Sequence, residues 1–137
     1  MCNELSVLLR EQLREGVRIL RAGGIVAFPT DTVYGLGANV FNLNAALRIY
    51  EVKRRARHMA LPLLVSDVRQ LKIVAHIAPA AEALIQQFWP GALTLVLQKQ
   101  NTVSEIVTGR SGKVAVRMPN HPIPLFLAQS LGAPIVG

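Results

Sequence analysis

Short apolar runs alternate along this chain with segments of helical periodicity, and this alternation restricts the fold more than any other feature. The strand-like runs cover residues 25–28, 61–65, 93–97 and 113–117, and another begins at Ile135. Interleaved strands and helices favour a sheet with helices packed against it. We therefore expect one α/β domain built on a twisted sheet.

Capping signals indicate where the first two helices begin and end. Leucine and valine recur at helical spacing over residues 5–20, and Gly23-Gly24 is expected to end that segment. Asn44 is expected to cap a second helix over residues 45–52, which ends in a cluster of cations.

The second half of the chain carries similar signals. Either Ser66 or Asp67 is expected to cap a short helix. Longer helices are predicted over residues 79–88, which begin with proline, and 122–131, which are followed by glycine. Residues 99–112 are expected to form a polar loop.

Composition favours a folded chain of one domain over residues 1–137. Hydrophobic residues make up 51% and charged residues 17%, which does not favour disorder. No apolar run is long enough to span a bilayer, and no signal-peptide pattern is present. The single cysteine, Cys2, can form no internal disulfide, so we expect a cytoplasmic protein without a membrane. Because the chain stops inside a strand at Gly137, we also expect it to lack a C-terminal part.

Net charge points to anionic partners. The formal charge is +7, and Lys53, Arg54, Arg55 and Arg57 lie close together. A solvated helix end explains such a cluster without any ligand. Alternatively, Lys53 and Arg55 form a phosphate clamp, since lysine supplies a point charge and arginine a rigid fork.

Two glycine-rich stretches do not meet the requirements of known nucleotide motifs. Gly35-Leu36-Gly37 begins like a dinucleotide fingerprint, but Val40 stands where glycine or alanine is needed. The stretch from Gly109 to Lys113 has the wrong spacing for a phosphate loop. Neither a Rossmann site nor a P-loop is predicted.

The stretch PTDTVYGLG, residues 29–37, concentrates polar and flexible residues directly after an apolar strand. It is explained either by an ordinary turn, in which Thr30 and Asp31 satisfy local backbone groups, or by a ligand loop at a strand end. In the second case the hydroxyls of Thr30, Thr32 and Tyr34 are candidate substrate contacts. The glycines would let the ligand approach the backbone.

Arg117 and Trp89 are two further positions with distinct chemistry. Arg117 ends a strand and is a candidate for binding a carboxylate or phosphate. Trp89 is expected to lie in the core, and no metal site is predicted from the three scattered histidines.

The ordered set of these stretches resembles the YrdC-like family, whose best-known members are L-threonylcarbamoyladenylate synthases. The resemblance rests on residues 29–37, Lys53-x-Arg55, the turn at residues 89–94, and residues 116–119 with His121-Pro122. It runs from about residue 10 to the last residue. It implies an open mixed α/β sheet with flanking helices and a basic concave face.

The resemblance also implies a reaction. Family enzymes are nucleotidyltransferases that combine L-threonine, bicarbonate and ATP, which is accompanied by Mg²⁺, into threonylcarbamoyl-AMP and release pyrophosphate. Other proteins, the downstream threonylcarbamoyl-transferases, move the product onto adenosine 37 of tRNA (t6A modification). By matching position, Lys53 and Arg55 would neutralise the phosphates, and Thr32 and its neighbours would line the threonine pocket. Arg117 would meet the threonine carboxylate or a phosphate.

The chain departs from the family pattern at several positions. Arg54 and Ala56 replace the usual Gly and Pro, Met59 stands where a ligand-site Lys is usual, and Ala92 replaces a Pro. The family's Ser-Ala-Asn motif is absent. These departures lead us to expect poor activity from the 137 residues.

Two alternatives stay open. One is a non-catalytic module that binds double-stranded RNA or tRNA. The other is the related domain of hydrogenase-maturation carbamoyltransferases, which the absence of zinc-finger-like cysteines disfavours.

Overall fold

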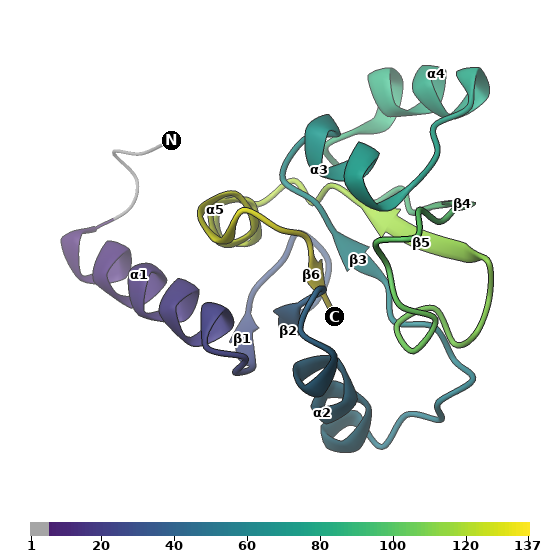
Figure 1. Cartoon of the computed structure of the whole chain (residues 1–137). Helices are drawn as coiled ribbons and strands as arrows, with labels where there is room; N and C mark the ends of the chain where they lie inside the picture. The colour runs from purple at the N-terminus through teal and green to yellow at the C-terminus, as the bar shows by residue number, and fades with distance from the viewer. Residues whose placement is uncertain (1–5) are drawn as a thin grey trace.

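A computed structural model describes residues 6–137. Cys2 and the expected helix start at Leu5 lie outside the described residues. Within residues 6–137, five helices flank one six-stranded sheet (Figure 1). The helices are α1 (Val7–Arg21), α2 (Leu43–Lys53), α3 (Val68–Val74), α4 (Pro79–Phe88) and α5 (Pro122–Leu131). The strands are β1 (Val26–Phe28), β2 (Gly35–Asn39), β3 (Leu63–Leu64), β4 (Leu95–Gln98), β5 (Lys113–Arg117) and β6 (Ile135–Val136).

The sheet is mixed and open. Its strand order is β1-β2-β6-β3-β5-β4, and only the β3–β5 pair is parallel. The expected α/β architecture with an open mixed sheet and flanking helices is confirmed. No helix among the described residues has the length and apolar character needed to cross a membrane.

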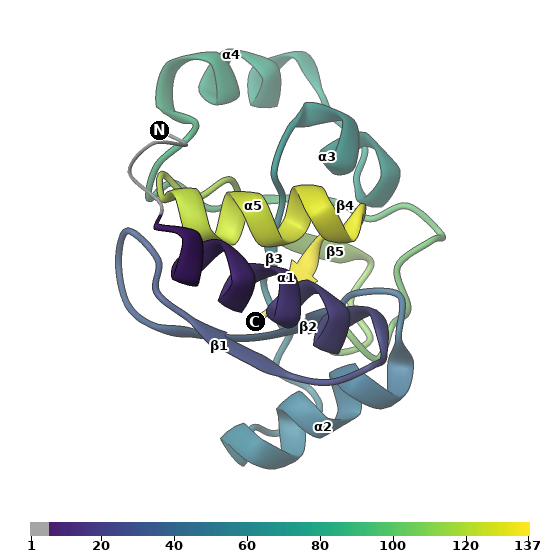
Figure 2. The same cartoon turned by 90° about the vertical axis from the view of Figure 1, so that its left-hand side faces the viewer.

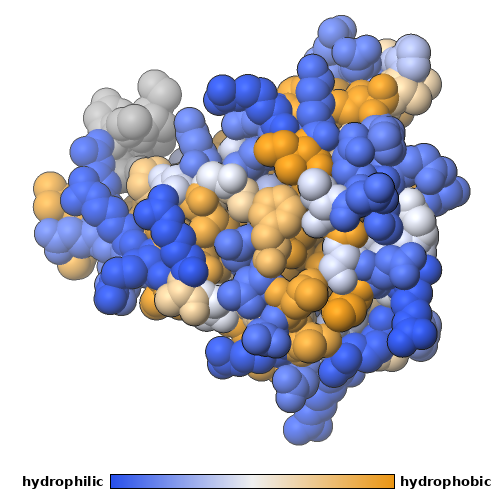
Figure 3. All heavy atoms as spheres, viewed as in Figure 1, coloured by the Kyte–Doolittle hydropathy of each residue, from blue (hydrophilic) through white to orange (hydrophobic). Residues whose placement is uncertain are grey.

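Two hydrophobic cores lie on opposite faces of the sheet, because successive strand residues point to opposite sides. Val136 packs with residues of α2, α3 and α4, and neighbouring Ile135 packs with residues of α1 and α5. Helices α1 and α5 run side by side over their face of the sheet (Figures 1 and 2). Trp89 belongs to the first core, as predicted. On the outside, hydrophilic side chains cover most of the outline of the face in Figure 3, with hydrophobic ones visible near its middle.

The helix predictions hold best where proline or glycine marks an end of the helix. Helices α4 and α5 have the predicted bounds, and Gly132 adopts the left-handed conformation behind α5. Asp67, one of the two candidates, caps α3. The cap predicted for α2 was wrong: the side chain of Asn42, rather than that of Asn44, accepts a 3.0 Å hydrogen bond from the Ala45 N–H.

Two segments differ from expectation because tertiary contacts override their local character. Residues 99–112 form a loop, but Val103, Val107 and Thr108 are buried in it. Gly35 to Asn39 form the strand β2, although glycine is a poor strand former. A Cβ atom on Gly37 would come within 2.4 Å of Ile135 Cγ2 and 2.7 Å of Phe28 Cε1. This glycine therefore serves close packing between strands. That the glycines of this stretch let a ligand approach the backbone stays a prediction.

Candidate functional site

A cavity of about 200 Å³, here called the loop pocket, lies between the β1–β2 loop and the sheet. It collects residues from six separate stretches of the chain. Its lining consists of Phe28, Thr30, Thr32, Val33, Tyr34, Gly35, Lys53, Pro62, Leu64, Thr94, Arg117 and Gly137. Five of the six predicted site residues are therefore brought together, and Arg55 is the one that does not line the cavity.

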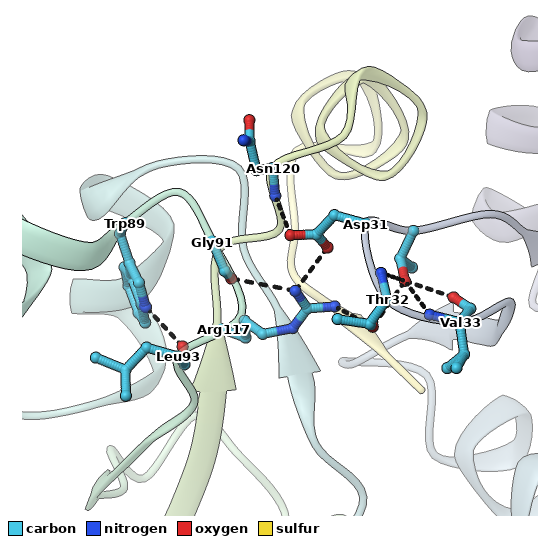
Figure 4. Close-up of polar contacts among 9 residues, drawn as sticks. Asp31, Thr32, Val33, Trp89, Gly91, Leu93, Arg117 and Asn120 are labelled. Atoms are coloured by element: carbon cyan, nitrogen blue, oxygen red, sulfur yellow. Dashed lines mark hydrogen bonds and ion pairs between the residues drawn. The ribbon is translucent and has the colours of Figure 1, made fainter.

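The β1–β2 loop was expected to lie at a strand end of an open α/β sheet, but a different feature positions it. Strand β1 is an edge strand that pairs antiparallel with β2, so the loop is a hairpin connection and not the crossover of a parallel sheet. What ties it to the centre of the molecule is an ion pair. Arg117 Nη1, at the end of β5, lies 2.7 Å from Asp31 Oδ1 (Figure 4).

This ion pair is the centre of a polar network. Arg117 Nη1 also donates to the Gly91 carbonyl at 3.1 Å, and Nη2 donates to Thr32 Oγ1 at 3.3 Å. The second carboxylate oxygen of Asp31 accepts from the Asn120 N–H at 3.0 Å (Figure 4). Only 11% of the Arg117 side chain and 18% of the Asp31 side chain are exposed. The network therefore joins three segments, with the ion-pair side chains mostly shielded from water and Thr32 and Asn120 exposed.

The network keeps Asp31 ionised. Burial alone would raise the pKa of Asp31, but the hydrogen bonds from Arg117 and from the Asn120 N–H, together with the Arg117 charge, lower it below its ordinary value. Sequence reasoning considered Asp31 only as a local turn residue. Its actual partners lie 86 and 89 positions away, and nothing near it in the sequence indicates them.

Thr30 behaves as the local-turn explanation expected. Its Oγ1 accepts from the N–H groups of Thr32 and Val33 at 3.2 and 3.1 Å, and it donates to the Val33 carbonyl. Tyr34, by contrast, is 77% exposed beside the cavity. The predicted hydroxyl residues thus take different places: Thr30 shapes the loop, while Tyr34 is free to meet a ligand or solvent.

Lys53 supplies positive charge to the wall of the loop pocket. It ends α2, and its Nζ donates to the Gly137 carbonyl. Burial, followed by the nearby charge of Arg55, lowers the pKa of Lys53. An anion placed in the pocket would relieve both effects, because it would restore a partner for the charge.

Arg55 faces a different environment. Its Nη2 donates to the Ala60 carbonyl at 2.8 Å, and its buried Nε has no hydrogen-bond partner within residues 6–137. Arg57 lies over the ring of Tyr50, with its guanidinium carbon 5.8 Å from the centroid. Neither arginine has a carboxylate partner among the described residues.

The described residues include no group of three or more His, Cys, Asp or Glu side chains that could hold a metal ion. Asp31, which lies between the lining residues Thr30 and Thr32 in the sequence, already accepts from Arg117 and Asn120. A Mg²⁺ ion that arrives with a nucleotide fits this arrangement, because phosphate oxygens and water can supply most of its ligands.

The chain matches a protein-family model and several known proteins. The Sua5/YciO/YrdC family model, described as "Telomere recombination", matches residues 18–137. The chain is 44% identical over 126 residues to the threonylcarbamoyl-AMP synthase of Bacillus subtilis, with 90% of this chain and 36% of the relative covered. It is 45% identical over 137 residues to the corresponding protein of Pyrococcus abyssi, with 96% and 40% covered.

A solved structure is similar as well. The crystal structure of Pyrococcus abyssi Sua5 complexed with L-threonine matches with a TM-score of 0.89 and 44% identity, over 92% of this chain and 37% of that one. The chain therefore spans between 36% and 40% of the length of these relatives. Over most of its own length it shares their sequence and fold, and it belongs to the Sua5/YciO/YrdC family.

Proposed function

We propose that this chain makes L-threonylcarbamoyl-AMP from L-threonine, bicarbonate and ATP and releases pyrophosphate. One observation carries the proposal: the loop pocket gathers Thr30, Thr32, Tyr34, Arg117 and Lys53 in one cavity. These are five of the residues that the family resemblance marks for substrate. The relatives that are 44% and 45% identical are named threonylcarbamoyl-AMP synthases.

The arrangement suits this reaction. The threonine amine and bicarbonate would condense, with loss of water, to threonine carbamate, an anion. Its oxygen would then attack the α-phosphorus of ATP while pyrophosphate leaves. Both reactants are negative, so cations must offset their repulsion, and no side-chain nucleophile is needed. Lys53, inside the pocket, and Arg55, beside it, would neutralise the phosphates. Mg²⁺ would enter as part of the MgATP substrate and balance the remaining charge.

Substrate roles follow from the pocket walls. Thr30, Thr32 and Tyr34 would surround the amino acid, and Arg117 would lie next to it. The product would pass to a threonylcarbamoyl-transferase that modifies adenosine 37 of tRNA. Because family enzymes usually have Lys at the position of Met59, we expect low turnover.

A second function is favoured by one observation. Lys53, Arg54 and Arg57 are exposed and have no carboxylate partner among the described residues. Such a group of cations can bind the backbone of double-stranded RNA or tRNA without catalysis. That binding would weaken steeply with salt and would not depend on L-threonine.

The deciding experiment measures pyrophosphate release from ATP, with and without L-threonine and bicarbonate. Release that needs both cosubstrates, and that is lost in a Lys53→Ala, Arg55→Ala variant, would support the synthase. The matched control is Lys72→Ala, which removes an exposed lysine from α3. Absence of threonine-dependent release, together with salt-sensitive RNA binding, would favour the RNA-binding module instead.

A further inference from the structure

A second cavity, here called the helix groove, lies between α1 and α5, which run side by side (Figure 2). Its volume is about 440 Å³. Its lining consists of Arg14, Val17, Arg18, Arg21, Phe126 and Ser130. The helix groove shares no lining residue with the loop pocket, and the proposed reaction uses none of these side chains.

One face of α1 supplies the charge of the helix groove. The α1 residues in its lining, at positions 14, 17, 18 and 21, follow the i, i+3, i+4, i+7 pattern, so they share one face of the helix. The three arginines of this face are exposed, whereas Val17 is buried and Phe126 of α5 is half-buried. No carboxylate lines the groove, and α5 contains no charged residue. The helix groove therefore combines exposed cations with an apolar floor.

The three arginines are only partly engaged. Arg14 has no hydrogen bond or ion pair within residues 6–137. Arg18 pairs with Glu15, but 75% and 51% of their side chains are exposed, and such a pair contributes little stability. Arg21 Nη2 donates to the Ser130 carbonyl, and most of the five N–H donors of its guanidinium group stay available. Each cation can therefore bind a carboxylate without breaking a buried contact.

These features together fit an acidic helix of another protein. A carboxylate matches the planar fork of arginine, and arginine and aromatic side chains are enriched at protein interfaces. A helix laid between α1 and α5 would also place an apolar side chain on Val17 and Phe126. Nucleic acid would contact the cations through its phosphates but would leave this apolar floor unfilled.

A second copy of this chain is a poorer occupant. Its carboxylates beyond residue 15 stand singly, at positions 31, 51, 67, 82 and 105. Helix α1 itself has four arginines and two glutamates, so two such helices would repel each other. The charge of the helix groove is therefore complementary to a different protein.

We propose that the helix groove is the docking site for an acidic amphipathic helix of a partner protein. Carboxylates of matching spacing on that helix pair with Arg14, Arg18 and Arg21, and an apolar side chain between them lies on Val17 and Phe126. The three arginines span about 10 Å along α1, which is close to two turns of the partner helix. The inference does not rest on the proposed function, because the two cavities share no residue.

The test titrates the whole chain into a labelled synthetic peptide and follows fluorescence anisotropy. The peptide has roughly 18 residues, enough to form a helix, with three glutamates at the matching spacing and leucine between them. Exchanging its glutamates for glutamine, exchanging the leucine for alanine, or scrambling its order should each weaken binding by on the order of 10-fold. These comparisons use the original chain, so they do not depend on the folding of a variant.

Charge reversal in the chain locates the contact. The Arg14→Glu, Arg18→Glu variant should bind the peptide about 10-fold or more weakly, and a peptide with lysine in place of glutamate should bind this variant better than it binds the original chain. The matched control is Arg69→Glu, Lys72→Glu, which makes the same change of net charge on exposed residues of α3. It should change the affinity by less than about twofold. Thermal unfolding checks that both variants are folded.

Every other outcome overturns the proposal. Equal binding of the ordered and scrambled peptides, or equal losses in the two charge-reversed variants, would show attraction by net charge alone. Tight binding of an RNA duplex that is lost only in Arg14→Glu, Arg18→Glu would assign the helix groove to nucleic acid. A dimer of the original chain that this variant dissociates, measured by sedimentation, would assign the groove to a second copy. The proposed function is tested separately, because pyrophosphate release should be the same in this variant as in the original chain.

Discussion

The two polar regions around the loop pocket handle charge in opposite ways. In the network of Asp31, Thr32 and Arg117, a cation and an anion face each other at 2.7 Å and are mostly shielded from water. In the basic segment, residues 53–57, Lys53, Arg55 and Arg57 have no carboxylate partner among the described residues. The first region is balanced internally and supplies geometry. The second carries unbalanced charge and supplies attraction for an anion.

Arg117→Ala breaks the balanced region and should have the largest effect. It leaves the Asp31 carboxylate without its cation, at a cost of about 2–3 kcal/mol for a pair that is mostly buried. Arg57→Ala, in the basic segment, should cost no more than about 1 kcal/mol, the worth of an exposed cation–π contact. Urea unfolding of both variants measures the difference. Equal losses would mean that the two regions do not differ in this way.

Ionic strength should change ligand binding differently at the two regions. Raising ionic strength from 50 to 500 mM should weaken MgATP binding by about 10-fold, because the attraction comes from unbalanced charges near the surface. L-threonine affinity should change by less than about twofold if, as proposed, its contacts lie beside the balanced network. Parallel titrations at the two salt concentrations check this, with sodium chloride replaced by an equal ionic strength of potassium acetate as a control for chloride binding. A threonine affinity as sensitive to salt as that of MgATP would contradict the assignment.

Acid should weaken the balanced region and leave the basic segment unchanged, since residues 53–57 contain no carboxylate. The pKa of Asp31 is lower in the folded chain than its ordinary value of about 3.9, so the ion pair stabilises the fold fully above that value. Its contribution is lost as the pH falls through the lower, folded pKa. The difference in free energy of unfolding between the original chain and Asp31→Asn should therefore shrink between pH 6 and pH 2. A constant difference over that range would show that the Asp31 charge does not contribute.

The smallest effect concerns the backbone of the basic segment. Arg54 caps α2 with φ 52° and ψ 41°, a left-handed conformation that favours glycine, and the resembling family usually has glycine there. Arg54→Gly should stabilise the chain by about 0.5–1 kcal/mol. Thermal unfolding measures this, with Arg69→Gly inside α3 as a control that should destabilise. A lower melting temperature for Arg54→Gly would show that the arginine side chain makes a stabilising contact.

Local signals predicted the parts of the fold that depend on local chemistry. Proline at the start of α4 and α5, and glycine after α5, gave their bounds because these residues restrict or release the backbone in any context. Asparagine occurs at both positions 42 and 44, so the sequence offered two caps for α2, and the structure uses the one that reaches the Ala45 N–H. Strand β2 could not be predicted, because the crowding of Gly37 by Phe28 and Ile135 arises only in the folded chain.

The candidate site also has a part that the sequence predicted and a part that it did not. The hydroxyl groups of residues 30–34 and the cation Lys53 could be recognised by residue type and by family resemblance, and they do meet in one cavity. The role of Asp31 could not, because both of its partners are more than 80 positions away. Whether Arg55 and Arg117 touch substrate stays a prediction, and Arg117 is already engaged with Asp31, Gly91 and Thr32.

The polar network has a consequence for how the family can vary. It joins residues 31–32, the turn at Gly91 and residues 117–120, so one substitution leaves partners in the other segments unsatisfied. Replacing Asp31 alone leaves the Arg117 guanidinium without its carboxylate partner, and replacing Arg117 alone leaves the Asp31 carboxylate without its cation. We expect these positions to change together or not at all among homologues. Correlated substitution at positions 31 and 117 would then be an evolutionary record of the same contact.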